Sequence, residues 1–250
     1  MRKLLLIAAF LPNSLLADDI VRLAVASNFI QTAAELSKHF SETSAIEVRI
    51  SSGSTGKLYA QIINGAPFDV FLAADAERPR LLEQGGYAVQ GSRVTYATGA
   101  LVLWSGDDAL VGRNCREVLE RGDYGHLAIA NPATAPYGAA AKRFLADAGL
   151  WEEARKRAVF GENIAQTLQF VATGNATLGF VAASQMRHRG LPPTTCEWRV
   201  PDPGGSQLDQ QLVLLSAAAS NRAARDFVNY MASEQATAII ARSGYGVPGR

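Results

Sequence analysis

The chain has 250 residues, 48% of them apolar, and its 24 Lys and Arg residues nearly balance 23 Asp and Glu residues, for a net charge of +1. The apolar content excludes a disordered chain, and the balanced charge argues against a nucleic-acid binder, which carries a basic excess or stripe. The length suits one or two domains, and no apolar run after residue 17 reaches the roughly 20 residues of a membrane helix.

The N-terminus has the pattern of an export signal. Met1 to Lys3 form a short basic head, Leu4 to Leu11 form an apolar run, and Ala17 is a small residue just before Asp18 and Asp19. We therefore predict that residues 1–17 are a signal peptide cleaved near Ala17, which in a bacterium sends the chain to the periplasm. A buried first helix is the alternative interpretation, and the abrupt change to acidic residues argues against it.

The first part of the chain alternates strands and helices. Apolar and β-branched runs predict strands, helical spacing of apolar residues predicts helices, and Gly or Pro residues mark the ends. In chain order, we expect strands at 21–26, 46–50 and 70–74, each followed by a helix, at 29–40, 58–63 and 78–84. Such alternation predicts a mostly parallel sheet that is covered by helices.

The rest of the chain repeats this α/β theme. We expect strands at 101–104, 127–130, 178–182 and 212–216, and helices at 116–121, 139–148 and 165–172. A single long helix is predicted at 222–242, where Gly244, Gly246 and Pro248 follow it. The fold class predicted from both parts is therefore α/β.

Four junctions that lead into predicted helices carry polar or glycine residues. They are Ser27-Asn28, the Ser/Gly-rich segment 51–56, Pro136-Tyr137-Gly138, and the segment 161–164. Ordinary helix capping is the simplest interpretation of each junction alone. Helix starts also present unpaired N–H groups and about half a positive charge, so four that converge on one cleft would bind an anion without Lys or Arg.

Motifs for catalysis are weak. Ser54 and Lys57 form the S-x-x-K of penicillin-binding enzymes, but the S-D-N and K-T-G motifs that accompany it are missing. The segment 51–57 does not fit a Walker A loop, G-x-S-x-G is absent, and the histidines at 39, 126 and 188 are scattered. An exported Ser-Lys hydrolase remains as a remote alternative.

The chain resembles the periplasmic molybdate-binding proteins of bacterial ABC importers over its whole mature length. The resemblance rests on a series of motifs: LAVASNF at 23–29, SSGSTGKLYAQI at 51–62, GAPFDVFLAAD at 65–75, ANPATAPYG at 130–138, GENIAQTL at 161–168, GNATLGFVAAS at 174–184 and SGYGVP at 243–248. In this order, the motifs are more specific than any one of them alone.

The resemblance implies the architecture of a type II periplasmic binding protein. Two α/β lobes would close on a ligand cleft, and two crossing strands, near 97–99 and 203–207, would form the hinge. Lobe 1 would comprise residues 18–98 and 206–250, and lobe 2 would comprise residues 99–205.

The resemblance also implies the ligand and its binding residues. In the family, hydroxyls and backbone N–H groups at helix starts hold tetrahedral molybdate or tungstate. Some members add a tyrosine at the position of Ala182, whereas this chain follows the members that lack it. The matching residues here are Ser27, Asn28, Ser54, Tyr137 and, through its backbone N–H, Ile164.

The function implied is high-affinity binding of molybdate or tungstate and delivery to an ABC permease with a cytoplasmic ATPase. Neither enzymatic activity nor a cofactor is expected, and a monomer is expected for a carrier that docks one face to its permease. A related carrier selective for another tetrahedral oxyanion, such as sulfate, is the alternative, because the sequence does not give the pocket size. Phosphate fits less well, because its proton needs an acceptor and no acidic residue is in the predicted set.

The two cysteines, Cys115 and Cys196, both fall in the predicted lobe 2. An exported protein can keep a disulfide, and an even number of cysteines permits one. Two separate buried thiols are the alternative, and we favour the bridge.

Overall fold

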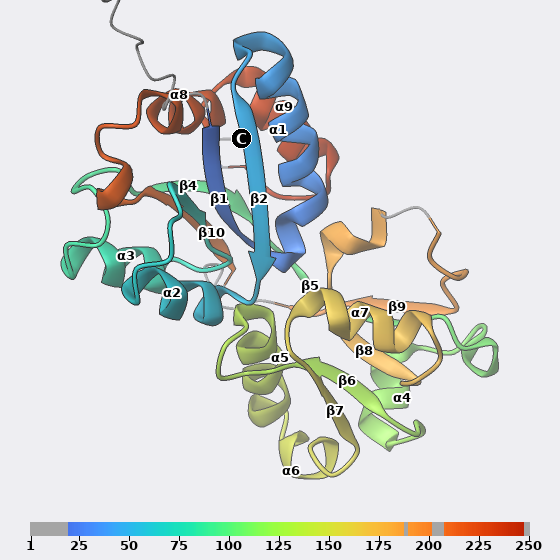
Figure 1. Cartoon of the computed structure of the whole chain (residues 1–250). Helices are drawn as coiled ribbons and strands as arrows, with labels where there is room; N and C mark the ends of the chain where they lie inside the picture. The colour runs from blue at the N-terminus through green and yellow to red at the C-terminus, as the bar shows by residue number, and fades with distance from the viewer. Residues whose placement is uncertain (1–19, 188–189, 202–207, 248–250) are drawn as a thin grey trace, which may run out of the picture.

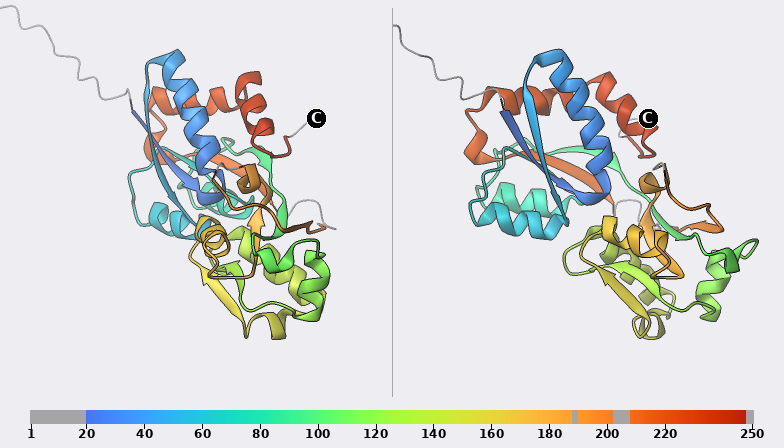
Figure 2. Two further views of the ribbon diagram at one scale, coloured as in Figure 1. Left: turned by 90° about the vertical axis from the view of Figure 1, so that its right-hand side faces the viewer. Right: turned by 45° about the vertical axis from the view of Figure 1, so that its right-hand side comes forward.

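The computed structural model describes residues 20–187, 190–201 and 208–247. The predicted signal peptide, at 1–17, and the second predicted crossing, at 203–207, lie outside these residues. The described residues form two five-stranded sheets, and Figures 1 and 2 show each sheet with its helices as a separate lobe. We call the unit built on the first sheet lobe 1 and the other lobe 2. The predicted two-lobed α/β fold is confirmed.

Lobe 1 contains the sheet β2-β1-β3-β10-β4. Its strands are β1 (Ile20–Ala26), β2 (Glu47–Gly53), β3 (Val70–Leu72), β4 (Val94–Thr98) and β10 (Asp209–Leu214). Its helices are η1 (Ser27–Phe29), α1 (Ile30–Ser44), α2 (Thr55–Ile63), α3 (Glu77–Gln84), η4 (Ser216–Ala218), α8 (Arg222–Met231) and α9 (Glu234–Arg242). β1 is parallel to β2 and β3, whereas β10 is antiparallel to β3 and β4. One strand of the five therefore runs against the others.

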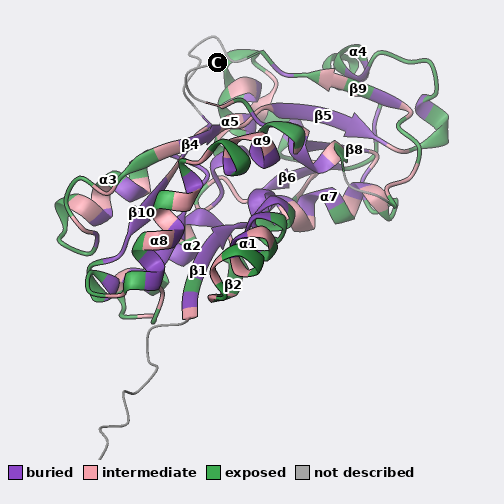
Figure 3. Cartoon of the chain, turned by 90° about the horizontal axis from the view of Figure 1, so that it is seen from above, coloured by how far each residue is buried: buried purple, intermediate pink, exposed green. Residues whose placement is uncertain are grey.

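The two faces of this sheet are covered by different helices because side chains alternate along each strand. Val21, Leu23 and Val25 of β1 belong to the core cluster formed with α1, α8 and α9. Ala24 belongs to a second cluster formed with α2 and α3. Figure 3 shows the resulting layers, with buried strands inside and helices whose outer faces are exposed.

Lobe 2 repeats this plan with the sheet β7-β6-β8-β5-β9. Its strands are β5 (Leu101–Ser105), β6 (Leu127–Ala130), β7 (Ala158–Gly161), β8 (Leu178–Ala182) and β9 (Cys196–Arg199). Its helices are η2 (Asp108–Leu110), α4 (Cys115–Arg121), α5 (Pro136–Asp147), α6 (Trp151–Ala154), α7 (Ile164–Ala172) and η3 (Ala183–Arg187). β6 is parallel to β7 and β8, and β5 is antiparallel to β8 and β9. A disulfide joins Cys115 at the start of α4 to Cys196 at the start of β9, with the Sγ atoms 1.94 Å apart.

The single long helix predicted at 222–242 is wrong. The segment forms two helices, because α8 ends at Met231 and α9 begins at Glu234. Ser233 is the N-cap of the second helix, and its side chain accepts a hydrogen bond from the N–H of Ala236. A Ser followed by Glu in the first turn is a start signal that outweighs the continuous helical pattern.

The chain passes from lobe 1 to lobe 2 between Thr98 of β4 and Leu101 of β5. It returns between Arg199 of β9 and Asp209 of β10. Throughout the described ranges, every helix is too short or too polar to cross a bilayer.

Candidate oxyanion-binding site

A small cavity lies where the two lobes meet, and helix starts from both lobes line it. Figure 1 shows α2, α5 and α7 at this boundary. The structure brings all five residues of the predicted site to this cavity, whereas their role in binding stays a prediction. The lining consists of Ala26, Ser27, Asn28, Gly53, Ser54, Thr55 and Ala74 from lobe 1, and Ala135, Pro136, Tyr137 and Ile164 from lobe 2.

Ser54 places a hydroxyl without a partner at the wall of this cavity. The residue is 3% exposed, and its Oγ makes no hydrogen bond within the described residues. Ser54 occupies the N-cap position of α2, but its side chain does not cap the helix. A buried polar group without a partner costs about 1–3 kcal/mol of stability, so a polar ligand at this place would satisfy it.

Ser27 and Ile164 supply donors from two other helix starts. Ser27 is the first residue of η1, which leads into α1, and it is buried. At the start of α7, Asn163 Oδ1 accepts hydrogen bonds from the N–H groups of Ala165 (3.0 Å) and Gln166 (3.1 Å). This ordinary cap does not use the N–H of Ile164, and Ile164 is one of the residues that line the cavity.

Tyr137 lies in the first turn of α5, and its side chain is buried. Its hydroxyl oxygen accepts a hydrogen bond from Gln210 Nε2 at 3.2 Å. Burial raises the pKa of Tyr137 well above its ordinary value, and the neighbouring Tyr245 adds to this effect. The phenol therefore stays neutral and keeps a proton that it can donate.

The side-chain amide of Asn28 is engaged within the protein. Its Nδ2 donates to Gln210 Oε1 (2.9 Å) and to the Tyr245 hydroxyl (3.1 Å). Both N–H bonds of the amide are thereby used, so the backbone N–H is the donor that Asn28 can offer to a ligand. No local sequence pattern indicates a role for Gln210 or Tyr245 in the site, and only the folded chain brings them to Asn28.

The described lining of the cavity contains no charged side chain. An anion there would be held by neutral hydrogen-bond donors and by the positive ends of helices, as in other sites at helix starts. A tetrahedral dianion, which carries only acceptors, suits such a set of donors. A ligand that must donate would find few acceptors.

Two contacts bridge the lobes beside the cavity. Lys57 Nζ lies 2.6 Å from Glu162 Oε1, which joins α2 to the segment before α7. The Gly56 N–H donates to the Thr134 carbonyl at 2.8 Å, and a Cβ on Gly56 would lie 2.9 Å from that carbonyl oxygen. The lobes are therefore closed on each other. Lys57 pairs with Glu162 and not with Ser54, and this contact gives no support to a Ser-Lys nucleophile.

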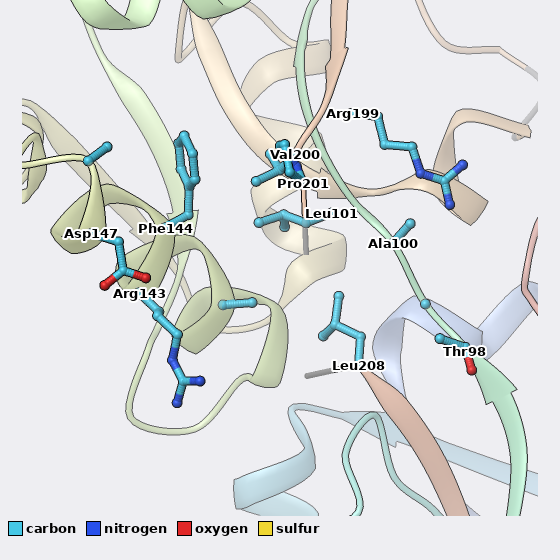
Figure 4. A pocket seen from close by; sticks show the side chains of 13 residues that line it. Thr98, Ala100, Leu101, Arg143, Phe144, Asp147, Arg199, Val200, Pro201 and Leu208 are labelled. Atoms are coloured by element: carbon cyan, nitrogen blue, oxygen red, sulfur yellow. The ribbon is translucent and has the colours of Figure 1, made fainter. Parts of the chain in front are cut away.

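A larger pocket lies on another side of the lobe junction (Figure 4). Among the described residues, its charged lining consists of Arg143 and Asp147 of α5 and Arg199 of β9, and Figure 4 shows the two arginines on opposite sides. Pro201 and Leu208 also line it. The arginines do not converge on one point, so this pocket does not have the geometry of an anion site.

The model of a family described as bacterial extracellular solute-binding proteins matches residues 21–246. The chain belongs to this family. Among curated relatives, the molybdate-binding protein ModA of Azotobacter vinelandii is 45% identical over 227 residues, which cover 91% of this chain and 90% of the relative. The protein of the same name from Rhodobacter capsulatus is 41% identical over 222 residues, which cover 89% and 86%.

A solved structure of a molybdate-binding protein also matches this solute-binding protein. The periplasmic molybdate-binding protein of Azotobacter vinelandii superposes with a TM-score of 0.85 at 38% identity. The match covers 91% of this chain and 99% of the other. The resemblance to periplasmic molybdate-binding proteins is thus confirmed over nearly the whole described chain.

Proposed function

We propose that this solute-binding protein binds molybdate in the periplasm and delivers it to an ABC importer. The observation that carries the proposal is the cavity between the lobes. Within the described part of the chain, its wall holds the unpaired Ser54 hydroxyl and other neutral donors, and no charged side chain. The names of the relatives from Azotobacter vinelandii and Rhodobacter capsulatus, both molybdate-binding proteins, support the choice of ligand. The protein acts as a carrier and not as an enzyme, and it needs no cofactor.

The binding set we propose is Ser27, Asn28, Ser54, Tyr137 and Ile164. Hydroxyl groups of the two serines and of Tyr137 donate to oxygen atoms of the anion, and the backbone N–H groups of Asn28 and Ile164 complete the set. Tungstate is a tetrahedral dianion like molybdate, so the same donors bind it. Sulfate has the same charge and shape but is smaller, so it leaves some of these donors without a partner.

The two lobes move relative to each other and enclose the ligand. We propose that lobe 1 (18–98 and 206–250) and lobe 2 (99–205) hinge at the two crossings and close around the anion. Residues 1–17 direct export and are removed near Ala17. The closed monomer then presents one face to a membrane permease whose ATPase lies in the cytoplasm.

Calorimetric titration of the mature protein with molybdate, tungstate, sulfate and phosphate tests this proposal. We expect one-to-one binding of molybdate and tungstate, tighter than sulfate or phosphate by about a hundredfold or more, which corresponds to roughly 2.7 kcal/mol. Sulfate that competes on equal terms would refute the selectivity. The absence of binding with all four anions would refute the function.

A further inference from the structure

Gln210 is a buried polar side chain that contacts residues of the proposed site from both lobes. It lies on β10, the strand that follows the return from lobe 2 to lobe 1, and is 0% exposed. Its Oε1 lies 2.9 Å from Asn28 Nδ2 and 3.1 Å from the Tyr96 hydroxyl, and its Nε2 lies 3.2 Å from the Tyr137 hydroxyl. One amide thus contacts a ligand-site residue in each lobe.

The direction of these hydrogen bonds is fixed by Tyr245. Its hydroxyl has one proton, which it donates to the backbone carbonyl of Asn28 at 2.8 Å. It therefore accepts from Asn28 Nδ2 at 3.1 Å and from Ser184 Oγ at 2.9 Å. Because Nδ2 must be the atom that faces Tyr245, Asn28 also donates to Gln210, and Gln210 must present its carbonyl oxygen to Asn28.

Because the carbonyl oxygen of Gln210 faces Asn28, the NH₂ group of Gln210 faces Tyr137. The phenol oxygen accepts that hydrogen bond, and among the described residues no protein acceptor takes the phenol proton. The proton is therefore free to point into the cavity, where Tyr137 lies in the wall. The relay that runs from Tyr245 through Asn28 and Gln210 makes Tyr137 a donor toward the ligand.

The close packing of Tyr137 and Gln210 depends on the lobe crossing itself. A Cβ on Gly99 would lie 2.9 Å from Gln210 Nε2 and would overlap the Tyr137 hydroxyl, only 2.2 Å away. Gly99 follows β4 at the first passage between the lobes. The crossing backbone, the amide and the phenol thus occupy one tightly packed volume.

We propose that Gln210 is a positioning residue that determines the selectivity of the anion site. By donating to the Tyr137 hydroxyl, it holds the phenol proton toward the cavity, so that the site favours oxyanions that bring only acceptors. This inference rests on the proposed function. A protonated oxyanion such as hydrogen phosphate brings an O–H group, and Gln210 already occupies one of the two lone pairs with which Tyr137 could accept it.

A double-mutant cycle tests whether Gln210 acts through Tyr137. Methionine is neutral and of similar length, so Gln210→Met removes the hydrogen bonds without adding charge. We expect Tyr137→Phe to weaken molybdate binding about tenfold to a hundredfold. We expect Gln210→Met to weaken it about threefold to tenfold in the wild-type background and less than about twofold in the Tyr137→Phe background. If Gln210→Met weakened molybdate binding by the same factor in the wild-type and Tyr137→Phe backgrounds, the positioning role would be overturned.

A second variant keeps the test decisive if Gln210→Met does not fold. Gln210→Glu has the same size, but its carboxylate only accepts, so it turns the Tyr137 proton away from the cavity. We expect the ratio of molybdate to phosphate affinity to fall by about tenfold or more. Gln211→Glu is the matched control, because the neighbouring Gln211 is bonded to Thr95 and Arg93 and not to Tyr137.

The outcomes separate this inference from the proposed function. A wild-type protein that binds none of molybdate, tungstate, sulfate and phosphate overturns both. If the wild-type protein binds molybdate and Gln210→Glu leaves the ratio of molybdate to phosphate affinity unchanged, only the role of Gln210 is overturned. A ratio that falls with Gln210→Glu and stays constant with Gln211→Glu supports it.

Discussion

Replacing Ser54 with alanine should separate ligand binding from folding stability. The Ser54 hydroxyl is buried and makes no hydrogen bond within the described structure, and it does not cap α2. The variant loses no intramolecular hydrogen bond and removes a buried hydroxyl without a partner, so we expect the free energy of unfolding without ligand to stay the same or to rise by up to about 1–3 kcal/mol. A hydrogen bond to a charged group contributes about 1.5–3 kcal/mol, so molybdate affinity should fall roughly tenfold to more than a hundredfold.

Ser37→Ala is the matched control for this variant. Ser37 Oγ is another buried hydroxyl without a partner in the described structure, and Ser37 does not line the cavity. We expect it to leave molybdate affinity unchanged and to change the free energy of unfolding in the same direction as Ser54→Ala does. Calorimetric titration measures affinity, and urea unfolding without ligand measures stability. Wild-type affinity in Ser54→Ala, or an equal loss in both variants, would refute the role of Ser54.

Three further predictions follow from the lobe contacts, the disulfide and the buried phenol. Lys57→Glu should weaken molybdate binding about twofold to fivefold, because the new carboxylate repels Glu162 across the closed lobes. Adding Glu162→Lys should restore the affinity. A calorimetric titration that shows no restoration would contradict this role of the half-exposed pair. Protein from an oxidising compartment should carry the Cys115–Cys196 disulfide. Reducing this bond should lower the free energy of unfolding by about 2–4 kcal/mol and leave molybdate binding largely intact. Two free thiols in unreduced, denatured protein would contradict the presence of the disulfide. Burial raises the pKa of Tyr137 above the ordinary phenol value of about 10, so its donor form, and with it the affinity for molybdate, should persist from about pH 7 to above about pH 10. A loss of affinity centred near pH 10 that is absent in Tyr137→Phe would show an ordinary phenol.

The sequence predicts the interior strands better than the edge strands. The apolar runs at 70–74, 127–130 and 178–182 correspond to β3, β6 and β8, which lie inside their sheets. The strands β4, β7 and β9 were not predicted, and all three lie at sheet edges. An edge strand contacts one neighbour and carries mixed polar and apolar side chains, so its local pattern is weak and its pairing depends on distant residues.

The site shows the same division between local and long-range information. Ser27, Ser54 and Tyr137 could be named because each stands at the start of a predicted helix. Their approach to one cavity was an expectation from the family resemblance, since helical spacing carries no information on how lobes meet. Gln210 and Tyr245 gave no local signal, because they are separated by 182 and 217 residues from the Asn28 side chain that they contact.

The location of molybdenum in a crystal of the complex tests the central claim most directly. Anomalous scattering from the metal should give one strong peak in the cavity between Ser54 and Tyr137, with anion oxygens within hydrogen-bond distance of both hydroxyls and of the Ile164 N–H. A peak in the larger pocket beside Arg143 and Arg199, with the small cavity empty, would contradict the account.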